Sequence, residues 1–349
     1  MEAISRLGIG PMSREIIEAV YSYSHTRNTP LMLIASKNQI DYDRGYVFKT
    51  SDYRQYLDQM KRQYSGANVY ICRDHCGPGH NSVFELEDTY KTIEADIANG
   101  FDLIHVDFCF HSGPHKEILD QSKKAIQFIH SQAPRTMIEV GTDENTATNI
   151  EDTLRAEASM KYFTSFCEPH FFVLQTGTII KEDRQEGIFH EDYVKKLHGL
   201  ASKYGVLLKE HNADYLPASE IQRRKNLVGA VNVAPQFGVL QTQLTLFKAK
   251  QYGIDPSEFI DVSYRSRKWE KWLNRNDEHN RLLCTTIAGH YNFNSDAYKR
   301  LFDEIMQHEN FNAVIQQEMH RIFDHYVLNL EGLSPALEEF TIKRETRAV

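Results

Sequence analysis

Short runs of apolar residues recur along the first 250 residues, and most are separated by a segment with helical spacing. The runs are continuous rather than alternating, which is typical of strands buried on both faces of a parallel sheet. The alternation of strand and helix predicts parallel β/α connections. The predicted strands cover residues 7–10, 31–36, 69–75, 103–108, 136–141, 171–177, 206–211 and 228–234.

Helices are predicted between these strands. They cover residues 14–25, 50–64, 84–99, 115–132, 147–163, 190–203, 217–225 and 238–251. Eight strand–helix units in about 250 residues match a (β/α)8 TIM barrel of the α/β class. A doubly wound open sheet is the competing fold, but it usually carries a glycine-rich phosphate turn after an early strand, and neither GxGxxG nor GxxxxGK[ST] occurs here.

The pattern changes after about residue 255. A basic stretch at 263–276 contains both tryptophans, and polar helical segments follow it. We therefore expect a TIM barrel over residues 1–255, a helical C-terminal extension packed on it over 256–335, and a loose tail over 336–349.

Composition excludes several classes of protein. The net charge of −8 argues against a nucleic-acid binder, because phosphate backbones require a basic face. The five cysteines are odd in number and form no CxxC pair, so neither a disulfide framework nor a cysteine-rich zinc module is expected. The N-terminus lacks a signal-peptide pattern, and no apolar run reaches the roughly 18 residues of a membrane span. We expect a cytoplasmic protein with no membrane partner.

Polar side chains stand at the ends of six successive predicted strands. Because parallel strands of a barrel all end on one face, these side chains are expected to share one site. They are Asp74, His75, His105, Asp107, Glu139, Gln175, Glu210, His211 and Asn232.

Two of these residues, His75 and His211, are imidazoles with a carboxylate beside each. That composition is typical of a divalent-metal site, with zinc as the expected ion. The alternative is a hydrogen-bonded polar mouth without metal. His105 lies inside its strand, where an orienting role and a ligand role are equally compatible with its position.

A metal with an open position polarises a carbonyl or stabilises an enediolate. A neighbouring carboxylate, Asp74 or Glu139, can then move a proton. This chemistry supports either retro-aldol cleavage or epimerisation and isomerisation of a ketose. The stretch from Asn232 to Gln236, before the last barrel helix, is the candidate for a phosphate site.

Seven segments in order resemble the class II tagatose-bisphosphate aldolase family, specifically its Z-type subunits. Together they cover about 300 residues. They are ASKNQID at 35–41 with GY at 45–46, RDHCGPG at 73–79, FDLIHVD at 101–107, TMIEVGTDE at 136–144, FFVLQTGT at 171–178, LLKEHNADYL at 207–216 and NFNSDAYKRLFDEI at 292–305.

The resemblance implies roles for individual residues. The Asp-His pair of that family makes Asp74 the catalytic acid/base and His75 a metal ligand, and the imidazole of strand seven falls on His211. The NVA stretch at 232–234 resembles that of the catalytic Y-type subunits, in which the asparagine, here Asn232, contacts substrate.

The chain also departs from the family pattern. Gln175 stands where the catalytic subunits have a third metal-binding histidine, so Glu139 or Gln175 is left as the third ligand. Residues 212–215 (NADY) replace the glycine-rich phosphate loop. Z-type subunits are regarded as non-catalytic stabilisers of a Y-type partner, and relatives act as sugar-acid epimerases.

Our prediction is a metal-dependent, class II aldolase-type enzyme that acts on a ketose or ketose phosphate. The alternatives are a metal-dependent epimerase or isomerase and a non-catalytic stabilising subunit. We expect either a homo-oligomer or a partner aldolase subunit. The predicted residues are Asp74, Glu139 and Asp107 for catalysis, His75, His211 and Gln175 for the metal, and Asn38, Gln39, Glu210, Asn232 and Gln236 for substrate.

Overall fold

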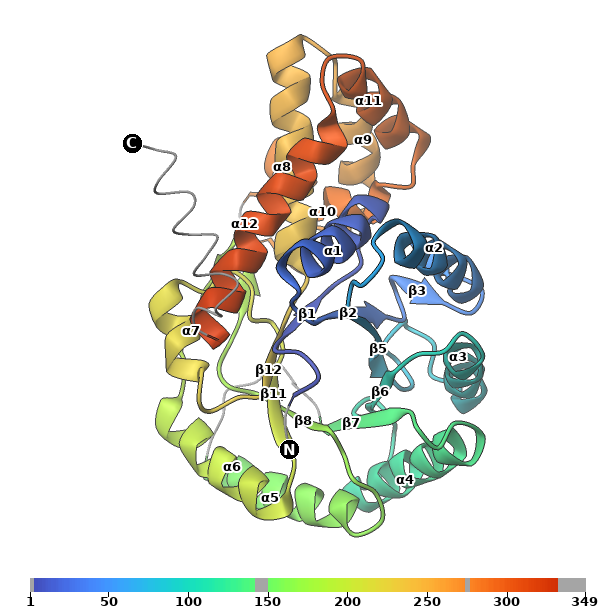
Figure 1. The fold of residues 1–349 in the computed structure, drawn as a ribbon, viewed down its shortest axis with the longest axis vertical. Helices are drawn as coiled ribbons and strands as arrows, with labels where there is room; N and C mark the ends of the chain where they lie inside the picture. The colour runs from blue at the N-terminus through green and yellow to red at the C-terminus, as the bar shows by residue number, and fades with distance from the viewer. Residues whose placement is uncertain (1–2, 142–149, 274–276, 332–349) are drawn as a thin grey trace.

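The computed structural model describes residues 3–141, 150–273 and 277–331, and within them eight parallel strands close into a barrel (Figure 1). The order around the barrel is β1, β2, β5, β6, β7, β8, β11 and β12, which returns to β1. The predicted TIM barrel is therefore confirmed. The strands are β1 (Leu7–Ile9), β2 (Leu31–Ser36), β5 (Val69–Cys76), β6 (Leu103–Val106), β7 (Met137–Gly141), β8 (Phe171–Leu174), β11 (Leu207–Glu210) and β12 (Ala230–Val233).

Helices surround the barrel on the outside (Figure 1). They are α1 (Arg14–Arg27), α2 (Thr50–Gln63), α3 (Leu86–Ala98), α4 (His115–Gln132), α5 (Ile150–Thr164), α6 (Glu191–Tyr204), α7 (Ala218–Arg224) and α8 (Pro235–Tyr252). The expected start of α5 at 147 lies outside the described residues. Helix α8 begins three residues before its predicted start, because proline is tolerated in the first turn, where its missing N–H has no helical partner.

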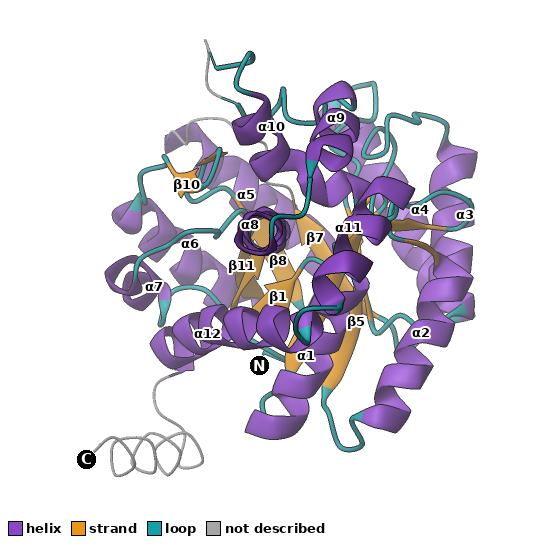
Figure 2. Ribbon diagram, turned by 90° about the horizontal axis from the view of Figure 1, so that it is seen from above, coloured by secondary structure: helices purple, strands orange, loops and turns teal. Residues whose placement is uncertain are grey.

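Two small sheets lie in the loops. Strands β3 (Ile40–Asp41) and β4 (Phe48–Lys49) pair after β2, and β9 (Ile180–Lys181) pairs with β10 (Arg184–Gln185) after β8. Figure 2 shows β10 at the edge of the molecule, away from the barrel strands.

The C-terminal part is helical, as expected. Its elements are α9 (Ser257–Arg265), α10 (Arg281–Ala288), the 3-10 helix η1 (Gly289–Asn292), α11 (Asp296–Met306) and α12 (Phe311–Glu331). Helix α12 runs back along α1 and α7, so the extension is packed on the barrel (Figure 1). The division at residue 255 stays a prediction, and the predicted tail lies outside the described residues. None of the described helices is long and apolar enough to cross a membrane.

Side chains along each strand alternate between the barrel interior and the surrounding helices. The interior holds an apolar layer of Met32, Ile34, Cys72, Leu103, Phe171 and Ala230. A buried ion pair joins Lys209 of β11 to Glu139 of β7 across the intervening strand β8, with Nζ and Oε2 2.6 Å apart. Lys209 Nζ also lies 5.0 Å from the Phe171 ring centroid, so this pair rests directly on the apolar layer. A buried ion pair that packs on an apolar layer gives the site above it a rigid support.

Charged residues at the alternate strand positions point outward, toward the surrounding helices. Arg73 of β5 donates to Asp96 of α3, with Nε and Oδ2 2.7 Å apart, and Arg224 of α7 donates to Glu210 of β11 over the same distance. All four side chains are almost fully buried. They therefore attach the helices to the outside of the barrel.

Candidate metal centre and active site

Asp74 and His75 enter the barrel mouth through an irregularity in β5. Neighbouring side chains of a regular strand point to opposite faces. Here the pairing register with β6 shifts between Arg73 and Cys76, and His75 has a φ of 46°. Such a bulge re-aims a side chain, and the left-handed conformation is uncommon for a residue with a Cβ. It allows both side chains to face the same site.

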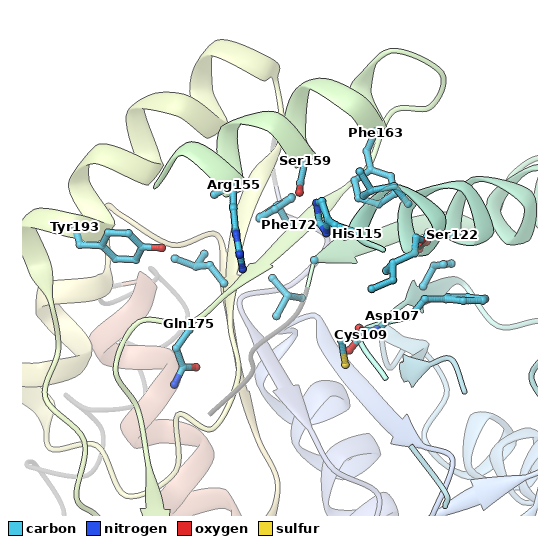
Figure 3. Close-up of a pocket in the computed structure, with 18 residues that line it drawn as sticks. Asp107, Cys109, His115, Ser122, Arg155, Ser159, Phe163, Phe172, Gln175 and Tyr193 are labelled. Carbon is cyan, nitrogen blue, oxygen red and sulfur yellow. Dashed lines mark hydrogen bonds between the residues drawn. The ribbon is translucent and has the colours of Figure 1, made fainter. Parts of the chain in front are cut away.

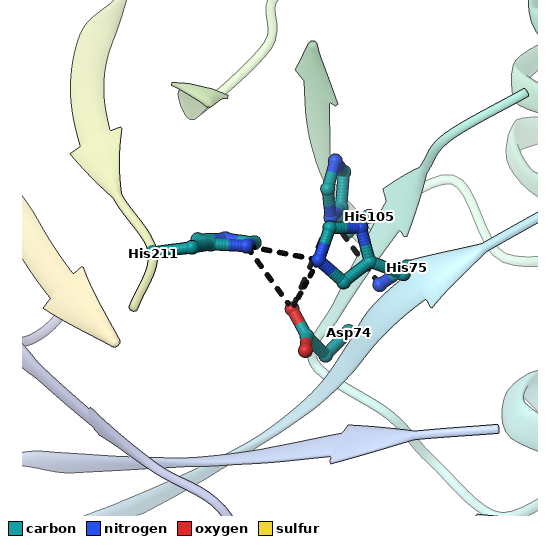
Figure 4. Close-up of side chains that lie close together, drawn as sticks. All are labelled: Asp74, His75, His105 and His211. Carbon is teal, nitrogen blue, oxygen red and sulfur yellow. Dashed lines mark hydrogen bonds and ion pairs between the residues drawn. The ribbon is translucent and has the colours of Figure 1, made fainter. Parts of the chain in front are cut away.

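Three imidazoles meet Asp74 at this mouth (Figure 4). His75 comes from β5, His105 from β6 and His211 from the residue after β11. One donor atom from each of the four residues lies within 4.8 Å of the others. His75 Nε2 and His211 Nδ1 are 3.1 Å apart. Asp74 Oδ1 lies 3.7 Å from His211 Nδ1 and 4.0 Å from both His75 Nε2 and His105 Nδ1.

Each imidazole is held from behind by an acceptor on its other nitrogen. His75 Nδ1 lies 2.8 Å from Asp107 Oδ2, and His211 Nε2 lies 3.2 Å from Glu139 Oε1. His105 Nε2 lies 2.8 Å from the Gly141 carbonyl oxygen. A carbonyl only accepts, so His105 Nε2 carries the proton.

The backbone N–H of His75 donates to His105 Nδ1 at 3.3 Å, which agrees with this tautomer. Protons on the outer nitrogens leave lone pairs on the inner ones, and the lone pair of His105 accepts the His75 N–H, so His105 would bind a metal in exchange for this hydrogen bond. Metal-binding histidines are almost always oriented in this way by a carboxylate or carbonyl.

Electrostatics keep the carboxylates of the site ionised. Burial would raise the pKa of Asp74, but the neighbouring His75, His211 and His105 hold it well below its usual range. Burial likewise opposes ionisation of Glu139, yet Lys209 and then His105 and His211 lower its pKa to about 2. Ionised carboxylates favour a cation at the centre of the cluster.

A divalent cation fits these residues. With protons on their outer nitrogens, the inner nitrogens of His75 and His211 face each other 3.1 Å apart, and either one proton or one bound cation between them satisfies both. Zn–N distances of about 2.0–2.1 Å place such nitrogens roughly 3.3 Å apart in a tetrahedral site. Asp74 Oδ1 is buried and accepts no hydrogen bond from the described residues. Three imidazoles suit zinc or a similar transition metal, and the Asp74 carboxylate adds a negative charge beside them.

A fourth imidazole, His80, extends the network. Its ring is stacked on that of His75 with centroids 5.0 Å apart, and its Nε2 lies 3.1 Å from the Asp107 carbonyl oxygen. Burial lowers the pKa of His80 to about 4, more than the Asp107 charge raises it, so the ring is neutral at pH 7. Its only sequence signal is its position directly after Gly-Pro-Gly, and it was not among the predicted residues.

The structure brings together five of the predicted site residues, and their roles differ in the geometry. Asp74, His75 and His211 belong to the cluster itself. Glu139 and Asp107 lie behind His211 and His75 and orient them. The third imidazole of the cluster is His105, for which the sequence left two roles open.

The other predicted residues lie around this centre or outside it. Asn232 points into the barrel from β12 and is buried, and neither of its amide atoms has a hydrogen-bond partner in the described chain. Asn38 donates to the His80 carbonyl oxygen at 2.8 Å, and Gln39 Oε1 accepts from the Ser36 N–H at 2.9 Å. Glu210 points away toward Arg224.

Gln175 lines a pocket of about 250 Å³ between the ends of β6–β8 and helices α4 and α5, where its Nε2 has no hydrogen-bond partner among the described residues. Its role as the third metal ligand stays a prediction. Asp107 lines the same pocket, so the pocket lies beside the residue that orients His75. Figure 3 shows Gln175, Arg155 and Tyr193 along it.

Fold and site together define a TIM barrel with an imidazole–carboxylate cluster at the carboxyl ends of its strands. In comparisons with known proteins, no family model matches the chain. A stretch of 98 residues is 28% identical to "D-tagatose-1,6-bisphosphate aldolase subunit GatZ" of Klebsiella oxytoca. That stretch covers 26% of this chain and 23% of the relative, so the chain matches less than a quarter of the relative's length.

Several solved structures share the fold. A probable tagatose 6 phosphate kinase from Sinorhizobium meliloti 1021 superposes with a TM-score of 0.74 at 15% identity, over 99% of this chain and 100% of that one. The fructuronate-tagaturonate epimerase UxaE from Cohnella laeviribosi gives 0.63 at 12%, over 94% and 81%. A fructose-bisphosphate aldolase from Campylobacter jejuni gives 0.55 at 11%, over 86% and 90%. The chain thus has this fold and a distant sequence similarity to GatZ.

Proposed function

We propose that the protein is a divalent-metal-dependent enzyme of the aldolase type that acts on a ketose. The observation that carries the proposal is the orientation of the three imidazoles. Each has an acceptor behind its outer nitrogen, and their inner nitrogens converge beside Asp74. His75, His105 and His211 would hold the metal, which when bound polarises a carbonyl oxygen and stabilises an enediolate.

The chain's own residues would position the substrate and move the proton. The side chain of Asp74 is 15% exposed at the barrel mouth and lies beside the imidazoles, so it is the residue that we assign to accept and return a proton next to the carbonyl. Glu139 and Asp107 keep the imidazoles in one tautomer. Asn232, whose buried amide has no partner among the described residues, would bind a substrate hydroxyl. The distant similarity to an aldolase subunit agrees with this chemistry.

Epimerisation of a ketose or sugar acid is the second candidate. It uses the same metal and the same proton transfer without cleavage of a carbon–carbon bond. The observation that favours it is the shared fold with a fructuronate-tagaturonate epimerase over 94% of this chain. The word "subunit" in the name of the GatZ relative supports the third possibility, a stabilising subunit of an aldolase complex.

Metal analysis tests the site. We expect about one zinc or similar ion per chain in protein purified without added metal, and loss of that ion in His105→Ala. His279→Ala is the matched control, because His279 is exposed in the turn before α10 and is not part of the cluster, and the metal content of this variant should equal that of the wild type. Wild-type protein without stoichiometric metal would refute the metalloenzyme proposal.

Turnover distinguishes the three functions. Incubation of the metal-loaded protein with ketoses in D2O, followed by NMR, should give three-carbon products if the protein is an aldolase. Exchange of one carbon-bound proton without cleavage would indicate an epimerase instead. Metal binding without turnover, together with co-purification of a second barrel protein, would favour the subunit role.

A further inference from the structure

The loop after β11 places a carboxylate on the first turn of α8. Asp214 is fully buried, and its Oδ1 accepts the backbone N–H groups of Ala234 at 3.0 Å and Gln236 at 2.8 Å. Pro235, between them, has no N–H to offer, and the next N–H, of Phe237, donates to the Ala234 carbonyl oxygen at 3.2 Å. The N–H groups from 234 to 237 are therefore all engaged.

This position is where a TIM barrel usually binds a phosphate group. The loops after the seventh and eighth strands, with a helix N-terminus, form an anion site because free N–H groups and the helix dipole both favour negative charge. In this chain Asp214 fills that role from within the protein. Burial raises the pKa of Asp214 to about 7, although two backbone N–H groups bond its Oδ1. Asp214 therefore excludes a substrate anion by occupying these N–H groups, whether or not it carries a full negative charge.

The loop is fixed from three sides, so Asp214 does not move aside easily. The Ala213 N–H donates to the Asn232 carbonyl oxygen at 3.0 Å, and the Tyr215 N–H donates to Gln236 Oε1 at 2.8 Å. Tyr326 of α12 donates its hydroxyl to the Ala213 carbonyl oxygen at 2.7 Å. The residues on both sides of Asp214 are thus hydrogen-bonded to β12, α8 and α12.

On the interior side of this loop, the polar group available to a substrate is the neutral side chain of Asn232. The Asn232 side chain, whose backbone holds this loop, is 4% exposed, and its two amide atoms are without partners in the described chain. Gly8 is its register partner on β1, and a side chain at Gly8 would collide with the Asn232 amide. An amide offers both donors and an acceptor, which match hydroxyl groups.

We propose that Asp214 excludes phosphate from this end of the site. The part of the sugar substrate that lies next to β11 and β12 then carries hydroxyl groups and no phosphate group. This inference rests on the proposed function for its substrate and names the class of that substrate: a free ketose or sugar acid. Asp214 is a specificity-determining residue in this account, and Asn232 binds the sugar.

Inorganic phosphate tests the exclusion without any activity assay. In isotope-labelled wild-type protein, the amide resonances of Ala234 and Gln236 should stay unmoved up to tens of millimolar phosphate. A saturable shift of these two resonances would overturn the proposal. Hydrogen exchange of the same two amides should accelerate at least tenfold in Asp214→Ala and stay slow in Asp214→Asn, which keeps an acceptor oxygen. If Asp214→Ala does not fold, the titration of the wild type and Asp214→Asn still decide.

A matched pair of sugars tests the substrate class. The kcat/KM of a free hexulose should exceed that of the same hexulose phosphorylated on its terminal carbon by at least tenfold, and Asn232→Ala should raise KM with its metal content unchanged. Preference for the phosphorylated sugar would overturn the inference. If neither sugar reacts, the proposed function fails, while the phosphate titration still decides whether Asp214 excludes the anion.

Discussion

Each of the three imidazoles has one nitrogen held by an acceptor and turns the other toward Asp74. For His211 the acceptor is Glu139, which is itself neutralised by Lys209 on the apolar floor of the barrel. This chain of contacts gives Glu139 two separable roles. It orients a metal ligand, and it balances a buried ammonium group.

Replacement of Glu139 separates these roles. Glu139→Gln should weaken metal binding by about 10–100-fold, because it removes the charge that orients His211. It should also lower the free energy of unfolding by about 3–5 kcal/mol, since Lys209 is then buried without a counter-charge. The double variant Glu139→Gln/Lys209→Met should regain much of the stability but none of the affinity. Chelator competition measures the affinity, and urea unfolding of metal-free protein measures the stability.

Glu210→Gln is the matched control. Glu210 also lies in a buried ion pair on the barrel wall, but it points outward to Arg224. We expect a similar loss of stability with unchanged metal affinity. Equal affinity in the Glu139 and Glu210 variants would contradict the orienting role of Glu139.

At the scale of elements, the C-terminal helix α12 completes the barrel mouth. The side chain of Tyr326 is buried, and its hydroxyl donates to the Ala213 carbonyl oxygen at 2.7 Å and lies 3.1 Å from Gln236 Oε1, an alternative acceptor. One hydroxyl therefore joins α12 to the loop after β11 and to α8, so that a helix more than 100 residues later in the chain fixes a loop of the site.

Tyr326→Phe should cost about 1–3 kcal/mol of unfolding free energy, because it leaves a buried carbonyl without its donor. It should also speed amide exchange at residues 212–216. Tyr252→Phe removes a hydroxyl that bonds Glu309 near the surface, and its cost should stay below about 1 kcal/mol. Chemical denaturation and hydrogen exchange measure both effects, and equal costs in the two variants would argue against the link through α12.

At the scale of the whole molecule, the contact between the extension and the barrel makes stability depend on pH. His290 of η1 is fully buried, its ring nitrogens have no partners among the described residues, and it packs against Gly238 of α8. Burial, with a smaller effect of Lys271, lowers its pKa to about 3 from an ordinary value of 6.5. As the pH falls, the unfolded chain therefore protonates this imidazole at a higher pH than the folded chain does. The stability that the neutral ring contributes is complete above pH 6.5 and is lost as the pH falls toward 3.

His290→Leu should remove this pH dependence. Between pH 7 and pH 5 the wild type should lose about 2 kcal/mol of unfolding free energy more than the variant does, since one unit of pKa shift corresponds to about 1.4 kcal/mol. Urea unfolding of both proteins at the two pH values measures the difference. Identical losses would show that His290 is not the group responsible.

The sequence by itself determined the barrel and the position of its site along the chain. Continuous apolar runs separated by helical segments are what a closed parallel sheet requires, and all eight predicted strands are present. The polar residues at their carboxyl ends marked the mouth, because every parallel strand ends on the same face. His75 and His211 were found in this way.

Only the tertiary structure decided which polar residues face one another. The direction of a side chain on a strand depends on its position in the in–out alternation and on bulges. The type of residue reveals neither. A bulge turns both Asp74 and His75 inward, and phase turns Lys209 inward and Glu210 outward. His105 is the third imidazole of the cluster, and Asp214 reaches α8 through contacts between segments distant in sequence. The chain order predicts the strand ends, but closure of the barrel fixes the distances between them.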